Sequence, residues 1–380
     1  MDFFWPRVTK VDTQTRKGAM MNSVHQYGAP YASALMAVKR AIEAGNAPDD
    51  SAIPSWLVQS WLRSRSHGLR LGDHRLVDRG YSPHLLNEQD RDLSAIVGEE
   101  IEAIWDSFGG ENWVAYCTNA QGVIIRAKHG SNPASRGFAL HVGRRILESD
   151  IGTTAPSCAL KEKKPITLIG AEHYLDEFFN MFCCAVPIWG GWGKVVGILN
   201  VTGSEEFKSR LVERKLLSAA IKIENRLFLD VHKENSVFRI HYDADFIDTH
   251  LAGLVSINKF GDVLSVTRNA LEMFDQVDVL HKRYSVSDLF YGDFVVAGDF
   301  CLKSHMKNGI VLYTKSCNEH SASVLNDRAA VRANGSLREL SDLHILEVMR
   351  KSGGNVSKAA EILNLSRTTI YRVLSRNSEK

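Results

Sequence analysis

Residues 353–376 read GGNVSKAAEILNLSRTTIYRVLSR, and this stretch decides the fold of the C-terminal part of the chain. The glycine pair ends a preceding helix, and Asn355 is a good N-cap for the next one. Asn364 stands at a tight corner, where Asn tolerates the left-handed conformation, and Ser366 caps a further helix. Short helices joined by a tight turn predict a helix-turn-helix.

Each expected helix has one apolar face. The residues expected to point inward are Leu343, Leu346, Val348 and Met349 in a first helix over 340–351, then Ala359, Ala360 and Leu363, then Ile370, Val373 and Leu374. Residues 350–380 hold seven Lys or Arg against two Asp or Glu, whereas the whole chain has a net charge of +2. This basic segment predicts phosphate binding. The side chains expected to contact DNA are Lys358, Arg367, Thr368, Thr369, Tyr371, Arg372 and Arg376.

The segment from Gly354 to Leu374 closely resembles the Fis-type DNA-binding domain of bacterial enhancer-binding regulators. One departure is Asn364, where that family usually has Gly. The resemblance implies a DNA-binding helix-turn-helix at residues 337–380.

Length and composition bound the rest of the chain. With 380 residues, 44% hydrophobic and 24% charged, two to four globular domains are expected. Neither a signal peptide nor an apolar run long enough to span a membrane is seen, so no membrane contact is expected. The six cysteines lack the spacing of a disulfide framework or a metal site, which favours the cytoplasm and predicts neither metal nor cofactor. Cys183 and Cys184 are neighbours in an expected strand and should point to opposite faces.

From Trp113 onward the pattern is that of an antiparallel sheet with flanking helices. Helical patterns are expected at 31–43, 53–68, 87–106, 142–148, 154–161, 174–180 and 210–233, and strands at 113–117, 123–125, 165–169, 183–188 and 195–201. The arrangement predicts an α+β sensor layout.

Residues 53–203 resemble the sensor region of the acetoin-catabolism regulator family. The motifs are Gly152-Thr-Thr-Ala155, Gly170-Ala-Glu-His173, Cys184-Ala-Val-Pro-Ile188 and Gly197-Ile-Leu-Asn-Val-Thr-Gly203, in the order seen in its GAF domains, preceded by Trp61-Leu-Arg-Ser-Arg. Leu147 and Thr154 replace the usual Trp and Asn, so that family's ligand is not carried over. The resemblance implies a pocket for a small organic effector. The side chains from which it would be drawn are Trp113, Tyr116, Thr153, Thr154, His173, Tyr174, Phe178, Phe179 and Cys183.

Residues 254–274 resemble the start of a PAS domain, and the likeness fades beyond Tyr291. The fold class expected is therefore multidomain α+β, with GAF and PAS-like antiparallel sheets flanked by helices and a C-terminal all-α helix-turn-helix. The expected order is a mobile tail (1–30), an N-terminal helical segment (31–95), a GAF sensor (96–235), a degenerate PAS-like domain (236–320), a linker (321–336) and the helix-turn-helix (337–380).

Enhancer-binding regulators normally carry an ATPase domain, whose phosphate loop needs Gly-x-x-x-x-Gly-Lys-Ser/Thr. The printed sequence has no such motif, since its Gly193-Lys194 dipeptide is followed by Val195. A ligand-responsive, non-enzymatic transcription regulator without ATPase activity is expected. Its expected partners are a palindromic double-stranded operator, a small organic effector and a second copy of the chain in a homodimer, with RNA polymerase or a full-length regulator as further partners.

Two alternatives stay open at this point. One is a ligand-independent architectural DNA binder or co-regulator. The other is a cysteine-based GAF-fold reductase that uses Cys117, Cys158, Cys183 and Cys184.

Overall fold

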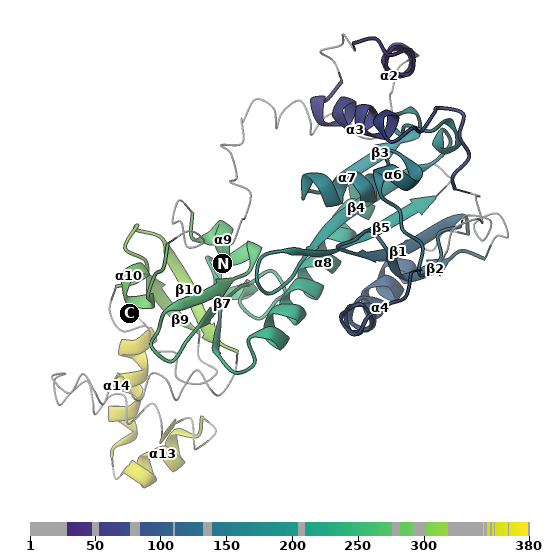
Figure 1. Cartoon of the computed structure of the whole chain (residues 1–380). Coiled ribbons are helices and arrows are strands. Elements are labelled where there is room, and N and C mark those ends of the chain that lie inside the picture. Colours follow the sequence, from purple (N-terminus) through teal and green to yellow (C-terminus); the bar gives the residue numbers. More distant parts are fainter. Residues whose placement is uncertain are drawn as a thin grey trace. The chain divides into compact units, whose positions relative to one another are not determined.

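The computed structural model (Figure 1) describes residues 29–47, 53–76, 84–108, 111–131, 139–203, 210–275, 282–291, 301–317, 345, 348–349, 352, 354–363 and 365–378. The chain divides into two compact units. Residues 194–224 belong with the N-terminal unit, and the C-terminal unit begins at Asn225 and includes Gly191–Gly193. The division falls inside helix α8 (Arg210–Val231), upstream of the boundary expected at 235–236. The expected linker 321–336 lies outside the described residues.

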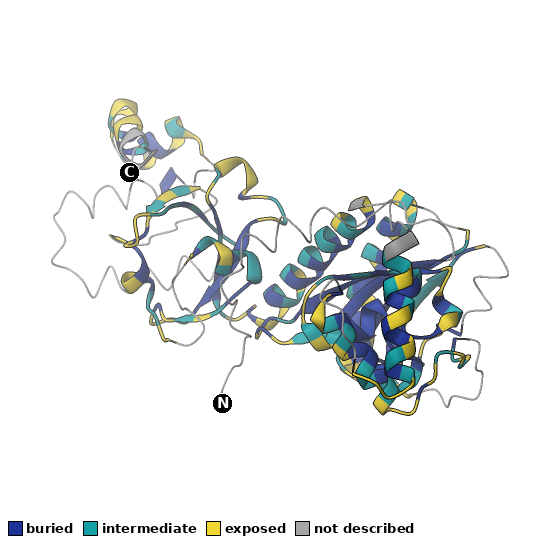
Figure 2. Cartoon of the chain, turned by 90° about the horizontal axis from the view of Figure 1, so that it is seen from above, coloured by how far each residue is buried: buried dark blue, intermediate teal, exposed yellow. Residues whose placement is uncertain are grey.

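The N-terminal unit is built on one antiparallel sheet, as the sequence predicts. Its strands are β1 (Trp113–Asn119), β2 (Ile124–His129), β3 (Ile166–Ile169), β4 (Phe182–Trp189) and β5 (Val195–Gly203), in the order β2-β1-β5-β4-β3. Every residue of β1 and β4 is buried, and Figure 2 shows the strands in the colour of buried residues. A strand buried on both faces needs a cover on each side of the sheet.

Helices supply both covers. Helix α4 (Glu88–Phe108) packs on β1 and β2, while α7 (Ala155–Glu162) packs on β3, β4 and β5. Helices α2 (Ala29–Glu43) and α3 (Ser55–Ser66) pack on each other, and α3 also contacts the short helix α6 (Glu148–Ile151). Leu35 of α2 and Trp61 of α3 share one hydrophobic core with α7 and the sheet. The two N-terminal helices are therefore part of the sheet's own core.

Two expected helices in this unit differ in the structure. The pattern at 142–148 forms no helix until Glu148, because Arg145 bridges to Val123 and the Arg144 guanidinium binds the carbonyls of Leu76 and Ala139. The pattern at 174–180 gives only a single 3-10 turn, η2 (Asp176–Phe178). In both places tertiary contacts override local periodicity.

The C-terminal unit has a second antiparallel sheet. Its strands are β6 (Ser236–His241), β7 (Gly253–Ile257), β8 (Val263–Val266), β9 (Leu302–His305) and β10 (Val311–Ser316), in the order β8-β7-β6-β10-β9. A 3-10 turn η3 (Ala244–Phe246) and the helices α9 (Arg268–Met273) and α10 (Val286–Leu289) lie between the strands. The sequence pattern did not predict β6 and β9.

The C-terminal helices α13 (Val356–Leu363) and α14 (Arg367–Ser378) form an all-helical module. Their core contains Ile345, Val348, Met349, Ala359, Ala360, Ile370 and Val373. Most of the first helix expected over 340–351 lies outside the described residues, as does the expected corner at Asn364. Two antiparallel sheets with helices plus an all-helical end confirm the predicted fold class.

Candidate nucleic-acid interface and sensor interior

The two helices of the C-terminal module begin with side-chain caps. The backbone N–H of Lys358 donates to Oδ1 of Asn355 (3.1 Å), and that of Thr369 donates to Oγ of Ser366 (3.1 Å). Each cap satisfies an otherwise free N–H in the first turn, and each helix start carries partial positive charge. Asn355 and Ser366 therefore cap their helices as predicted.

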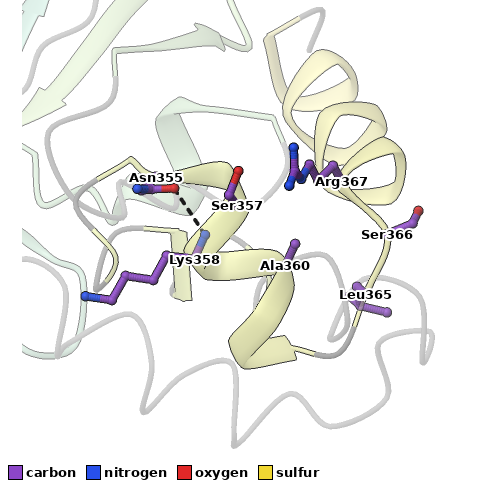
Figure 3. A pocket seen from close by; sticks show the side chains of 7 residues that line it. All are labelled: Asn355, Ser357, Lys358, Ala360, Leu365, Ser366 and Arg367. Carbon is purple, nitrogen blue, oxygen red and sulfur yellow. Dashed lines mark hydrogen bonds between the residues drawn. The ribbon is translucent and has the colours of Figure 1, made fainter.

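An open groove lies between the two helix starts (Figure 3). Its lining residues are Asn355, Ser357, Lys358, Ala360, Leu365, Ser366 and Arg367. In Figure 3 the Arg367 side chain extends from the start of α14 toward α13, whereas the Lys358 side chain points away from Arg367. The groove thus combines two helix starts with one guanidinium, that of Arg367, and groups of this kind hold a phosphate.

Helix α14 separates an apolar face from an exposed one. Ile370 and Val373 are buried at 0% and 1% exposure. Arg367, Thr368 and Arg372 are exposed, Tyr371 is 57% exposed, and Thr369 is half-buried beside its cap. Lys358 on α13 is also exposed, while the side chain of Arg376 lies outside the described part. The described candidate DNA contacts are thus solvent-exposed, except for the half-buried Thr369.

The candidate ligand residues of the N-terminal unit do not form one group. Tyr116, Tyr174, Phe178 and Cys183 belong to the core beneath α7, but Phe179 is 52% exposed. Trp113 lies three positions before Tyr116 and so points to the opposite face of the sheet. There its ring contacts Phe182 at a centroid distance of 5.1 Å.

The two threonines of the Gly-Thr-Thr motif have structural roles. Thr154 begins α7, where its backbone N–H donates to Oγ of Ser157 (3.0 Å). The Thr153 hydroxyl lies 2.8 Å from Oγ of Ser60 and 3.0 Å from Oγ of Ser64, both on α3. Both threonines are buried. Thr153 therefore joins the start of α7 to α3, whereas Thr154 bonds within α7, and an effector that bonded either hydroxyl would compete with these partners.

Two of the described candidates have a buried ring nitrogen without a hydrogen-bond partner, Nε1 of Trp113 and Nε2 of His173, and of these only His173 offers an acceptor. Its ring stacks on Phe178 with centroids 5.3 Å apart, and its Nδ1 lies 3.0 Å from the Gly170 carbonyl. Since a carbonyl only accepts, Nδ1 carries the proton and Nε2 is an acceptor. Burial lowers the pKa of His173 to about 4, so the ring is neutral at pH 7. Nε2 is buried and has no hydrogen-bond partner in the described structure.

A polar network under α3 was missed by the sequence reading. Arg63 donates to both oxygens of Glu148 (2.6 and 2.8 Å), and the Ser60 hydroxyl donates to the same carboxylate (2.6 Å). The sulfur of Cys158 lies 3.3 Å from the Ser60 hydroxyl oxygen. The only signal in the sequence is the four-residue spacing of Ser60 and Ser64, which places two hydroxyls on the buried side of one helix.

The cysteines of this unit do not resemble nucleophiles. Burial raises the pKa of Cys158, Cys183 and Cys184 to about 12, and raises that of Cys117 as well. Because the thiolate is the reactive form, these thiols are poorly suited to redox catalysis. Cys183 and Cys184 point to opposite faces, toward Thr202 and Thr167 respectively, as predicted. This geometry disfavours the reductase alternative.

Among the described helices, none is both long and apolar enough to cross a bilayer. The described residues also contain no cluster of three or more His, Cys, Asp or Glu side chains able to hold a metal ion.

Comparisons with known proteins give a family for the C-terminal residues and distant relatives for somewhat more than half of the chain. Residues 336–376 match the family "Bacterial regulatory protein, Fis family". The acetoin catabolism regulatory protein of Cupriavidus necator is 24% identical over 231 residues, which cover 58% of this chain and 34% of the relative. The signal-transduction and transcriptional-control protein of Clostridium beijerinckii is 20% identical over 203 residues, covering 52% and 32%. The chain thus spans about a third of the length of these two relatives.

Among solved structures, the E. coli DhaR(N)-DhaL complex resembles 69% of this chain with 12% identity and a TM-score of 0.42, covering 98% of the matched chain. Residues 336–376 are accordingly a Fis-family helix-turn-helix, in a chain similar in sequence to the acetoin catabolism regulatory protein.

Proposed function

We propose that the chain is a DNA-binding transcription regulator whose N-terminal unit senses a small organic molecule. The observation that carries the proposal is the exposed basic side of α14, which lies opposite the buried Ile370 and Val373. Arg367 and Arg372 stand on that side with Tyr371, next to two capped helix starts. Cations on a rigid helix can read guanine edges, while helix starts and hydroxyls hold phosphates.

Sensing is assigned to the interior of the N-terminal unit. His173 offers one unsatisfied acceptor, and Tyr116, Tyr174, Phe178 and Cys183 share its core. A small apolar molecule with one hydrogen-bond donor matches these groups. An effector acts by binding one conformation better than another, and such coupling is typically ~1–3 kcal/mol, or roughly 5–150-fold in operator affinity.

The proposal extends to the location of the chain, its oligomeric state, its operator and the way it is controlled. The chain acts in the cytoplasm as a homodimer on a palindromic operator, with half-site centres about 34 Å apart. Residues 1–380 contain no phosphate loop, so we assign them no ATP hydrolysis and place control in effector occupancy. We assign the sheet of the N-terminal unit to a GAF domain and that of the C-terminal unit to a PAS-like domain, on the resemblance of their sequences.

The test compares operator binding by the parent, an Arg367→Ala/Arg372→Ala variant and an Arg283→Ala control. Arg283 is exposed on the C-terminal unit, away from the helix-turn-helix sequence. The operator fragments are duplexes that the parent chain selects from a pool of random sequence. Loss of a guanine-reading Arg costs ~1–3 kcal/mol at the selected site, and the control is expected to match the parent. Unchanged binding by the double variant would refute the assignment of α14 as the recognition helix.

A further inference from the structure

Helix α2 buries a lysine among its apolar residues. Leu35, Val38 and Ile42 face the core at 2%, 5% and 2% exposure, and Lys39 on the same side is only 1% exposed. A buried ammonium group needs acceptors that replace water. Burial lowers the pKa of Lys39 to about 8, so the group still carries its charge at pH 7.

The acceptors come from the segment that follows the 3-10 turn η1 (Gly170–Glu172). Nζ of Lys39 donates to the carbonyls of His173 (3.0 Å) and Tyr174 (3.3 Å). A carboxylate oxygen of Asp176 lies 3.9 Å from the same nitrogen. The centroid of the Trp61 ring is 6.0 Å away, within the range of a cation–π contact. Carbonyls, a carboxylate and an indole ring together make a set that selects a cation.

Contacts other than Lys39 hold this set in place. Nε1 of Trp61 donates to the Glu172 carbonyl (2.9 Å), which fixes both the indole ring and the start of the segment. The backbone N–H of Asp176 donates to the Leu71 carbonyl (2.9 Å), which fixes its end. These two bonds anchor both ends of the segment that carries the two carbonyls, so we expect it to keep its course when the lysine side chain is removed.

We propose that the His173 and Tyr174 carbonyls, with Asp176 and Trp61, form a binding site for a primary ammonium group, which Lys39 occupies in cis. Helix α2, through Lys39, then blocks this site against other ammonium groups. A ligand or partner carrying a primary amine competes with Lys39, and displacing it releases α2 from the core. Anions do not compete, because every polar group that faces Nζ is an acceptor and one of them is charged. A neutral alcohol can donate a single hydrogen bond but has no charge to pair with Asp176, so it competes far less well than an ammonium group.

Chemical rescue tests the site directly. Lys39→Ala removes three methylene carbons beyond Cβ and the nitrogen, which together have the shape of n-propylammonium. We expect a lowered Tm for this variant in the full chain and a saturable recovery with n-propylammonium chloride. n-Propanol at the same concentrations should give no such recovery. Arg40→Ala, at the exposed neighbouring position of α2, serves as the matched control and should respond to n-propylammonium no more than to sodium chloride.

Lys39→Met provides the second variant, since its side chain fills the same space without a charge. It should show no saturable response to n-propylammonium. Equal recovery of Lys39→Ala with propanol would reduce the site to an apolar cavity and overturn the proposal, as would an equal response in the methionine variant. If Lys39→Ala does not fold, its refolding yield is measured with each additive, and equal yields overturn the proposal. The assay measures the binding of n-propylammonium and involves no DNA. A negative result would therefore overturn the ammonium site without bearing on the proposed DNA binding.

Discussion

The hydroxyl of Ser60 donates a 2.6 Å hydrogen bond to Oε1 of Glu148, a residue 88 positions later in the chain. This bond joins α3 to α6, and the same hydroxyl lies 2.8 Å from that of Thr153. One buried serine therefore connects the N-terminal helices to the Gly-Thr-Thr motif at the start of α7.

Removing that hydroxyl should destabilise the N-terminal unit. Ser60→Ala leaves a buried carboxylate and the Thr153 hydroxyl each short of one partner, at a cost of ~1–3 kcal/mol in the free energy of unfolding. Arg145→Ala is the control, because its ion pair with Asp150 stays in contact with solvent, with the two side chains 42% and 23% exposed, and pairs at the surface contribute ~0–1 kcal/mol. Urea unfolding of both variants gives the comparison. Equal losses of unfolding free energy in the two variants would show that the buried network stabilises the unit no more than a surface ion pair does.

Two substitutions at Ser366 separate folding from DNA binding. Ser366→Ala removes the cap of α14 and should cost ~1 kcal/mol of stability in the helical module. Ser366→Asp keeps a good cap and adds a negative charge at the helix start, so stability should be retained. Its charge repels phosphate, so we expect weaker binding to all duplexes. Thermal melts followed by circular dichroism, with anisotropy titrations, measure both effects. Unchanged DNA affinity in the Asp variant would show that the DNA phosphates do not lie near the start of α14.

The buried imidazole of His173 predicts a loss of stability in acid. Its folded-state pKa of about 4 lies below the ordinary value of 6.5, so between these pH values the unfolded chain binds the extra proton. Stability attributable to His173 is complete above pH 6.5 and falls as pH drops toward 4, by about 3 kcal/mol in total. His173→Gln lacks this proton, so its free energy of unfolding should fall less steeply over the same window. Parallel pH profiles would contradict the burial of a neutral ring.

Thiol labelling of the native chain tests the reductase alternative. Cys301 is exposed, Cys317 is half-buried, and Cys117, Cys158, Cys183 and Cys184 are buried. Under native conditions one thiol per chain should react rapidly, and Cys301→Ser should abolish that fast phase. The buried four should react only on unfolding, because access and thiolate formation are both suppressed. Rapid native labelling of Cys158 or Cys183 would reopen the possibility of cysteine chemistry.

Short-range features were predictable from the sequence. Asn355 and Ser366 cap helices whose apolar spacing fixes Ile370 and Val373 inside, and every one of these relations acts within a few residues. Strand alternation likewise places Cys183 and Cys184 on opposite faces. The same rule, applied to Trp113 and Tyr116, would have separated them, since their spacing is odd.

Long-range features were not predictable from local patterns. The partners of Lys39 lie 134 and 135 positions away, and nothing near residue 39 indicates them. A lysine within an apolar stripe was the only local sign. Strand β9 was missed because its sequence, LKSH, alternates without strong β-formers, and its pairing with β10 supplies the stability that its propensity does not.

The burial of Lys39 also has a consequence for synthesis on the ribosome. Helix α2 leaves the exit tunnel well before the carbonyls that receive its ammonium group, which are encoded 134 and 135 codons later. At translation rates of ~5–20 residues per second, this interval is on the order of 10 s. During that time the apolar stripe of Leu35, Val38 and Ile42 has no partner from the sheet, so the nascent helix is a natural client for a chaperone that holds short apolar segments.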